Sequence, residues 1–216
     1  MKTFKVGDNE YKIPNSWEDM TLGNYIDFFN FQDSNKDREV DDLYMIEVFE
    51  MLSDCDRVLD IPINELKDLL GELLFLSDTP KLNENKTILI DGKLYGCADL
   101  NKMTTGEYIS IKTLMGSEKT VLNGLPKLLS IIIRPAEEVI DSETGEKKLK
   151  IEKFSVDNLT WRAEKFKELK VVDVLHWISF FLTGREESST TTKHSTKVER
   201  KKETHGHLQS QSNSIG

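Results

Sequence analysis

The chain has 216 residues, and its acidic side chains outnumber its basic ones to give a formal net charge of −9 at neutral pH. That length allows one domain or two small ones, and the acidic balance argues against a general nucleic-acid-binding surface, which would be basic. Two cysteines, Cys55 and Cys97, are too few for a disulfide framework and are expected to be reduced thiols. No apolar run approaches the roughly 20 residues that a membrane span needs, so no membrane association is expected.

Residues 1–79 are predicted to form a first unit that begins with a β-hairpin. Two β-prone stretches within residues 4–13 flank Gly7-Asp8-Asn9, residue types that tolerate the positive φ angles of tight turns. A helix is expected from about Thr21 to Phe31, because the threonine hydroxyl can accept a hydrogen bond from an amide of the first turn. Two further helices are expected, at about residues 41–53 and from Pro62 to Leu76.

A polar bridge at residues 80–86 is predicted to lead into a second unit, residues 87–184. This unit also begins with a hairpin, whose turn is Asp91-Gly92. Thr104 and Glu107 have the spacing of a capping box, in which each side chain binds a backbone amide of the other residue. Beyond them we expect helices at about 105–115, 122–133, 156–169 and 171–182, and a β-hairpin inserted at 136–154.

The last segment, residues 185–216, has a different composition from the rest of the chain. Ser, Thr, Lys, His and Gln dominate it, and apolar residues are almost absent. Such a segment cannot bury enough surface to offset the entropy lost on ordering. We therefore expect a disordered, mildly basic tail.

A seven-residue motif occurs twice, each time behind a predicted hairpin. Residues 20–26 and 103–109 are identical at five of seven positions. We interpret the shared residues as structural, with the glycine allowing the hairpin to pack closely and the tyrosine covering the junction; the alternative is that Gly-x-Tyr is a binding element. The predicted fold is therefore mainly α with small β-hairpins (α+β), built from two tandem repeats of a hairpin plus about three helices. The shared residues are Met20, Thr21, Gly23, Tyr25 and Ile26 in the first copy, and Met103, Thr104, Gly106, Tyr108 and Ile109 in the second.

Side chains that could support catalysis or bind a metal are few and scattered. His205 and His207 could form a pair of metal ligands, but they lack further ligands at a fixed spacing and lie in the predicted tail. His176 lies on an apolar helix beside Trp177, which favours a core or interface histidine over a catalytic base. No glycine-rich phosphate-binding loop is recognisable. We therefore predict a protein that is not an enzyme and has no catalytic residues, no metal site and no cofactor.

The repeated unit resembles the tail assembly chaperones of tailed bacteriophages. The resemblance rests on Leu-x-x-Met-Thr-Thr-Gly-Glu-Tyr-Ile after an Asp-Gly hairpin, and on Met51-Leu52-Ser53-Asp54 followed by Ile61-Pro62-Ile63-Asn64-Glu65-Leu66 and a leucine-rich helix. It covers most of the first unit and the first half of the second. This chain departs from the family in its length, its two units, its inserted hairpin and its C-terminal tail. The resemblance implies a virion-morphogenesis protein of the host cell cytoplasm that holds an aggregation-prone virion protein soluble.

Two apolar runs are expected to bind that partner, because each is richer in apolar residues than one helix face requires. The alternatives are a structural or cargo component that stays in the phage particle and, third, a small regulatory or enzymatic domain. The sequence does not specify the oligomeric state. The candidate partner-binding residues are Leu66, Leu69, Leu73, Phe75 and Leu76 in the first unit, and Trp177, Phe180 and Phe181 in the second.

Overall fold

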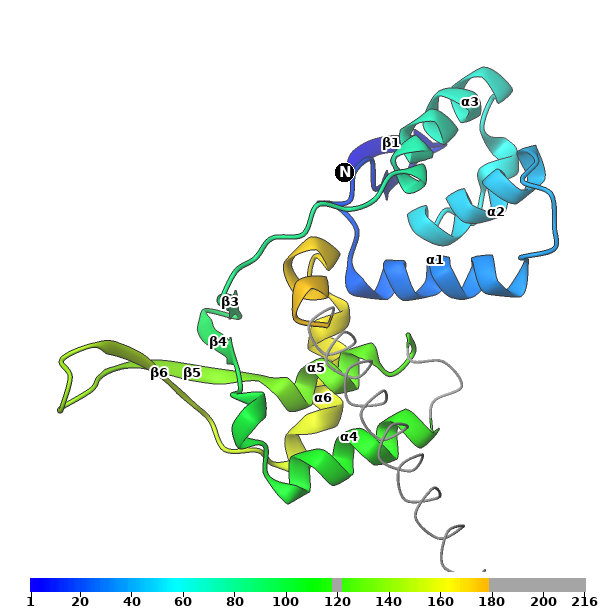
Figure 1. The fold of residues 1–216 in the computed structure, drawn as a ribbon. Coiled ribbons are helices and arrows are strands. Elements are labelled where there is room, and N and C mark those ends of the chain that lie inside the picture. Colours follow the sequence, from blue (N-terminus) through cyan, green and yellow to red (C-terminus); the bar gives the residue numbers. More distant parts are fainter. Residues whose placement is uncertain (118–121, 179–216) are drawn as a thin grey trace, which may run out of the picture. The chain divides into compact units, whose positions relative to one another are not determined.

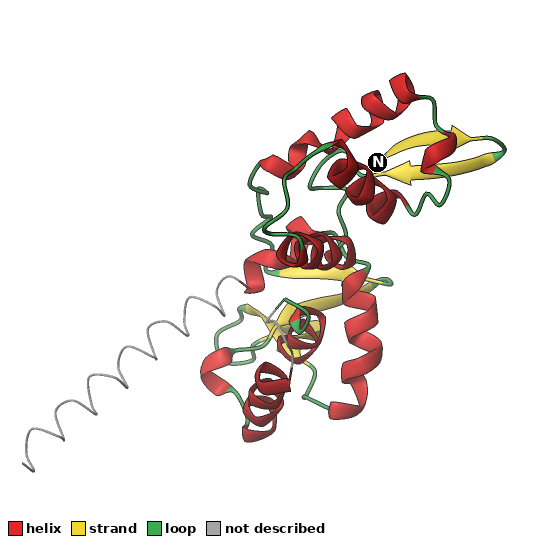
Figure 2. Ribbon diagram, turned by 90° about the vertical axis from the view of Figure 1, so that its right-hand side faces the viewer, coloured by secondary structure: helices red, strands yellow, loops and turns green. Residues whose placement is uncertain are grey.

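The computed structural model describes residues 1–117 and 122–178, which combine helices with two small antiparallel sheets (Figures 1 and 2). Residues 1–177 form one compact unit. The first part of the chain contains the strands β1 (Lys2–Val6) and β2 (Asn9–Ile13). It continues with the helices α1 (Leu22–Ser34), α2 (Asp42–Ser53) and α3 (Ile63–Gly71), and the 3₁₀ segments η1 (Val58–Asp60) and η2 (Glu72–Ser77).

The first hairpin forms a two-stranded sheet that packs on α2. Its register pairs Lys2 with Ile13, and Gly7 adopts the positive φ of +60° that the turn requires. Phe4 is buried and lies 5.3 Å from Phe49 of α2, measured between ring centroids. Because a two-stranded hairpin is marginal alone, this apolar contact with a helix stabilises it.

Helix α1 begins where the sequence predicts, but the leucine-rich segment after Pro62 differs from the prediction. Thr21 caps α1, accepting a hydrogen bond from the Asn24 amide at 3.1 Å. The expected continuous helix to Leu76 is wrong, since α3 ends at Gly71 and the chain winds more tightly as η2. In η2 successive side chains face different surroundings: Leu73 is 1% exposed, whereas Leu74 is 70% exposed.

The second hairpin is part of a four-stranded sheet with the order β3-β4-β5-β6. Asp91 and Gly92 both have positive φ, so they form the two-residue turn that the sequence predicts. The inserted hairpin is present, but it begins earlier than expected, because the preceding helix ends at Ile132 and β5 starts at once. The strands are β3 (Thr87–Ile90), β4 (Lys93–Cys97), β5 (Ile133–Ile140) and β6 (Lys147–Ile151).

The hairpin of β5 and β6 is joined to the sheet at its base only. Strand β4 pairs with residues 133–135 of β5, whereas residues 136–140 pair with β6 alone. In Figure 1 this hairpin accordingly extends past β3 and β4 as an arm. The predicted insertion is therefore an extension of the sheet rather than a separate element.

Four helices accompany the sheet: α4 (Thr105–Ser117), α5 (Leu125–Ile132), α6 (Leu159–Lys167) and a helix over residues 171–178, with the 3₁₀ segments η3 (Leu100–Lys102) and η4 (Val156–Asn158) between elements. All residues of α5 except Lys127 are buried, and α5 packs against α6 and α4. The rings of Tyr95 in β4 and Phe166 in α6 meet edge to face, with centroids 6.4 Å apart. Helix α6 therefore packs on α5 and touches β4 through this aromatic pair. The part of the predicted last helix beyond residue 178, and the predicted tail, lie outside the described residues.

A short antiparallel bridge connects the start of α1 to the segment after α6. The Leu22 amide donates to the Leu169 carbonyl at 2.8 Å, and the Val171 amide donates to the Met20 carbonyl at 2.9 Å. Gly23 lies against this same segment, because a Cβ at its position would be 3.4 Å from the Lys167 carbonyl oxygen. The prediction that this glycine faces the preceding hairpin is therefore wrong.

The tandem repeat is not confirmed, although both motif copies start a helix behind a hairpin. Tyr25 is half-buried against other rings, whereas Tyr108 is 53% exposed. Ile26 is 7% exposed, whereas its counterpart Ile109 is 56% exposed. The first hairpin forms a sheet of its own, whereas the second is part of a larger one. The likeness is therefore limited to the hairpin and the helix start, and the packing around the two copies differs.

Candidate protein-binding surface

Four aromatic rings form a continuous row along α1 and η2, which we call the ring row: Trp17, Tyr25, Phe29 and Phe75. The ring centroids of Trp17 and Phe75 are 5.4 Å apart and meet edge to face. Trp17 and Tyr25 follow at 6.1 Å, and Tyr25 and Phe29 at 4.5 Å. Separations in this range are those at which aromatic pairs attract one another.

Local structure fixes each member of the ring row. Tyr25 and Phe29 are one helical turn apart on α1, so their side chains lie on the same face. Trp17 precedes α1, and its indole nitrogen donates to the carbonyl of Asp78 at 3.1 Å. That hydrogen bond holds the segment before α1 against the end of η2, which carries Phe75. Residues almost 60 positions apart in the sequence are thereby placed side by side.

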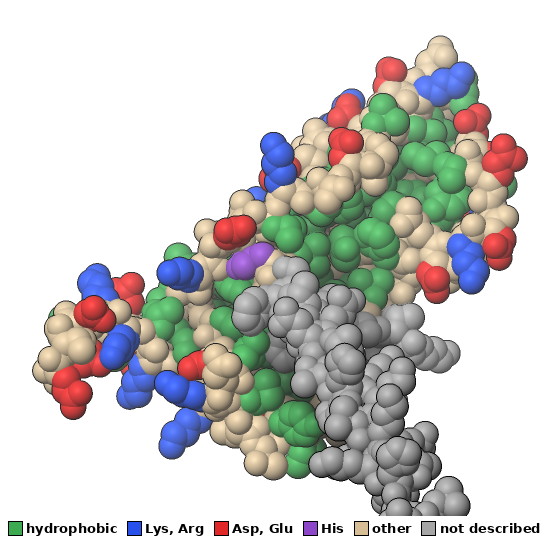
Figure 3. All heavy atoms as spheres, viewed as in Figure 1, with side chains coloured by type: hydrophobic (Ala, Val, Ile, Leu, Met, Phe, Trp, Pro, Cys, Tyr) green, Lys and Arg blue, Asp and Glu red, His purple; other side chains and the backbone are tan. Residues whose placement is uncertain are grey.

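The ring row is partly open to solvent. Trp17 is buried, whereas Tyr25, Phe29 and Phe75 are half-buried. Figure 3 shows hydrophobic side chains gathered on the surface over this part of the chain. Burial raises the pKa of Tyr25, and its hydroxyl makes no hydrogen bond to any other residue that the structure describes. A phenol of this kind is available to donate to a partner.

The candidate partner-binding residues divide into three groups. Leu66, Leu69 and Leu73 are at most 6% exposed and belong to the core, so the chain itself covers them. Phe75 and Leu76 are half-buried on η2, where Phe75 joins the ring row. Trp177 is 8% exposed, and Phe180 and Phe181 lie outside the described residues.

Sequence reasoning did not identify Trp17 or Phe29 as surface candidates. The available signal was the spacing of Tyr25 and Phe29 on the face that also carries Leu22 and Ile26. Because Leu22 and Ile26 are buried, the spacing alone predicts a core-facing stripe, with the aromatic pair at its margin.

Comparisons with protein-family models, with curated proteins and with solved structures found no match for this chain.

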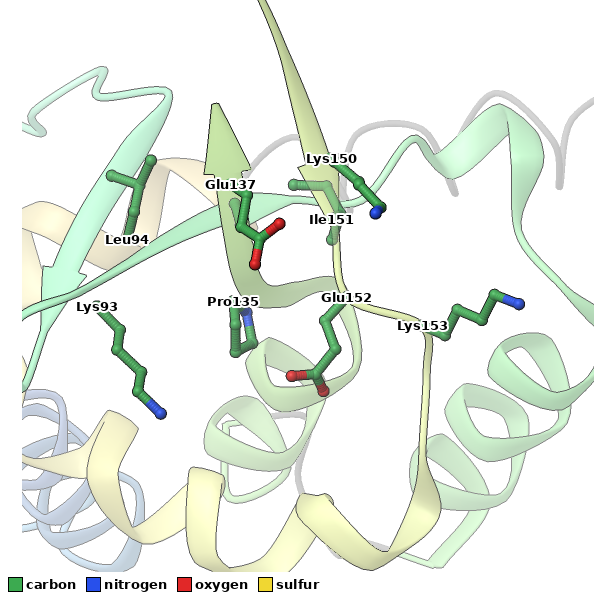
Figure 4. Close-up of a pocket in the computed structure, with 9 residues that line it drawn as sticks. Lys93, Leu94, Pro135, Glu137, Lys150, Ile151, Glu152 and Lys153 are labelled. Carbon is green, nitrogen blue, oxygen red and sulfur yellow. The ribbon is translucent and has the colours of Figure 1, made fainter. Parts of the chain in front are cut away.

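A second surface feature is a hollow of about 630 Å³ where β4 diverges from the arm of β5 and β6. Figure 4 shows the carboxylates of Glu137 and Glu152 in this hollow, with the ammonium groups of Lys150 and Lys153 pointing away from them. Glu152 forms an ion pair with the buried Arg162. The nine lining residues, all within the described part of the chain, include no hydroxyl, thiol or imidazole side chain. The hollow is therefore lined by charged and apolar side chains.

Two buried charged groups form a structural ion pair. Glu107 of α4 and Arg134 of β5 lie 2.7 Å apart, and each side chain is at most 7% exposed. The second carboxylate oxygen of Glu107 accepts from the Thr104 amide at 2.5 Å and from the Thr104 hydroxyl at 2.6 Å. Burial by itself raises the pKa of Glu107, but the hydrogen bonds from Thr104 and the charge of Arg134 outweigh it and lower the pKa. The predicted capping box thus also joins α4 to the sheet.

The remaining candidates show no grouping of metal ligands. His176 lies with its Nε2 atom 2.8 Å from the Asn85 carbonyl oxygen, and its ring is 4.4 Å from that of Trp177. Within residues 1–117 and 122–178, no three His, Cys, Asp or Glu side chains are placed to hold a metal ion, and no helix is long and apolar enough to cross a bilayer. His205 and His207 lie outside these ranges.

Proposed function

We propose that this chain is a non-enzymatic protein-binding protein of bacteriophage virion assembly that holds an aggregation-prone virion protein soluble. The ring row is the observation that carries the proposal. Half-buried aromatic side chains that adjoin on a surface are typical of protein-binding sites. The resemblance of the hairpin-helix motif to tail assembly chaperones supports a virion protein as the partner.

The physical role of the ring row follows from the chemistry of its members. Aromatic side chains bury a large apolar area on contact and lose little conformational freedom, since each has two χ angles. Edge-to-face and tilted contacts between the rings hold their positions in the free protein. A surface organised in advance avoids part of the entropic penalty of binding.

Co-expression with individual tail and other virion proteins encoded with the chain tests this proposal. The proposal predicts that one of them is recovered in the soluble fraction with the chain and precipitates without it. Mass spectrometry of purified particles then separates a chaperone, which is absent or present in traces, from a component retained in the particle. If no virion protein depends on the chain for solubility, the proposal is wrong.

A further inference from the structure

The negative charge of the chain is concentrated in the part that carries the ring row. Residues 1–79 contain 19 acidic and 7 basic side chains, a formal net charge of −12, whereas the whole chain has −9. Residues 80–216 are therefore weakly basic, at +3. A strong field of one sign attracts partners of the opposite sign and repels those of the same sign.

Most carboxylates of residues 1–79 are not neutralised within the described structure. Fourteen of the nineteen have no described lysine, arginine or N-terminal nitrogen within 4.0 Å. The five that form ion pairs are Asp19, Asp41, Glu47, Asp60 and Glu72.

Three of these unneutralised carboxylates adjoin the ring row, and we call them the rim carboxylates: Glu18, Asp33 and Asp78. Glu18 follows Trp17 directly, and Asp33 lies one helical turn after Phe29 on the same face of α1. The backbone carbonyl of Asp78 accepts a hydrogen bond from the indole nitrogen of Trp17. All three side chains are exposed.

We propose that the ring row and its rim carboxylates bind a basic amphipathic segment of the partner. Apolar side chains of that segment lie against the rings, and its lysines or arginines face the rim carboxylates. This inference rests on the proposed function and specifies the chemistry of the partner. An acidic segment with the same apolar face is repelled by the charge of residues 1–79.

Three synthetic peptides test the proposal against the full chain, with binding followed by fluorescence anisotropy. The first is an amphipathic helix of Leu and Lys, and the second replaces each Lys by Glu at the same length and apolar content. The third is the sequence of residues 185–216, which tests this chain's own basic tail as the occupant. We expect the Lys peptide to bind at least about tenfold more tightly than the Glu peptide, with a preference that falls as salt rises from about 0.05 to about 0.3 M.

Two matched sets of substitutions locate the site, each changing the net charge by three. The first set neutralises the rim carboxylates, and the second neutralises exposed carboxylates on the first hairpin and on α2. We expect the first set to weaken binding of the Lys peptide by about three- to tenfold and the second to change it by less than twofold. The first set is Glu18→Gln, Asp33→Asn and Asp78→Asn. The second set is Asp8→Asn, Glu10→Gln and Glu50→Gln.

Four results overturn the inference. If the two sets of substitutions weaken binding of the Lys peptide equally, the overall charge attracts the peptide and there is no specific site. If the Lys and Glu peptides bind equally, the surface does not select by charge. Binding of the 185–216 peptide as tightly as the Lys peptide assigns the surface to this chain's own tail. If the rim set leaves capture of a virion protein unchanged, this inference fails while the proposed function stands.

Discussion

Replacing Glu107 by glutamine should destabilise the fold far more than a change of one atom suggests. Both partners of the Glu107–Arg134 pair are almost fully buried, and the carboxylate also accepts two hydrogen bonds from Thr104. The amide keeps one acceptor oxygen, but its NH₂ group then faces a donor, and the arginine charge is left without its partner. Leaving a buried charge uncompensated costs about 3–5 kcal/mol, a large share of the 5–15 kcal/mol typical of a folded domain.

Urea denaturation followed by circular dichroism measures this loss. Glu138→Gln is the matched control, because Glu138 pairs with Lys147 on the exposed arm, where both side chains are more than 60% exposed. We expect the control to match the unsubstituted chain within error. The double variant Glu107→Leu with Arg134→Met removes both charges and should recover most of the lost stability. A loss below about 1 kcal/mol for Glu107→Gln would refute the reasoning, because the pair would then behave like a surface pair.

The same pair predicts how stability depends on pH. Because the folded structure lowers the pKa of Glu107 below its usual value of 4.5, the carboxylate stabilises the fold above that pH. This contribution decreases as the pH falls through the lowered folded pKa, where the carboxylate takes up a proton in the folded state as well. Between about pH 5 and pH 3, the unfolding free energy of Glu107→Gln should therefore fall less steeply than that of the unsubstituted chain. Parallel curves would show that Glu107 makes no such contribution.

Three further substitutions and one deletion test the packing. Gly96→Val should lower the unfolding free energy by about 1–3 kcal/mol, because a Cβ at Gly96 would lie 3.0 Å from an isoleucine side-chain carbon. Gly71→Ala should raise the unfolding free energy slightly, because a Cβ at Gly71 on α3 meets open space. Leu73→Asp should unfold the chain, since Leu73 is 1% exposed; a soluble, cooperatively folding variant would contradict this. Deleting 185–216 should change the unfolding free energy by less than about 1 kcal/mol, and a larger loss would show that the tail packs on the rest.

Features set by neighbouring residues could be predicted from the sequence. The Asp91-Gly92 turn, the Thr21 cap and the Thr104–Glu107 capping box each depend on a few adjacent positions, and each is present. The ends of most helices could be predicted for the same reason, because caps and apolar spacing are local signals.

Features that depend on distant residues could not be predicted. Nothing in the sequence indicates that β5 begins at Ile133 and pairs with β4, because that register depends on the whole sheet. The two copies of the seven-residue motif have similar local signals, but different neighbours bury Ile26 and expose Ile109. The ring row needs Phe75 to meet Trp17, a contact that no local pattern specifies.

The most direct test of the account compares the affinity of three chains for the captured virion protein: the unsubstituted chain, Tyr25→Ser and Tyr108→Ser. The two tyrosines occupy the same motif position, but only Tyr25 belongs to the ring row. We predict that Tyr25→Ser weakens binding by about 2 kcal/mol, or about thirtyfold in Kd, and that this variant remains folded by circular dichroism. Tyr108→Ser should bind as the unsubstituted chain does. Equal affinities for all three chains, or a loss confined to Tyr108→Ser, would contradict the ring row as the binding surface.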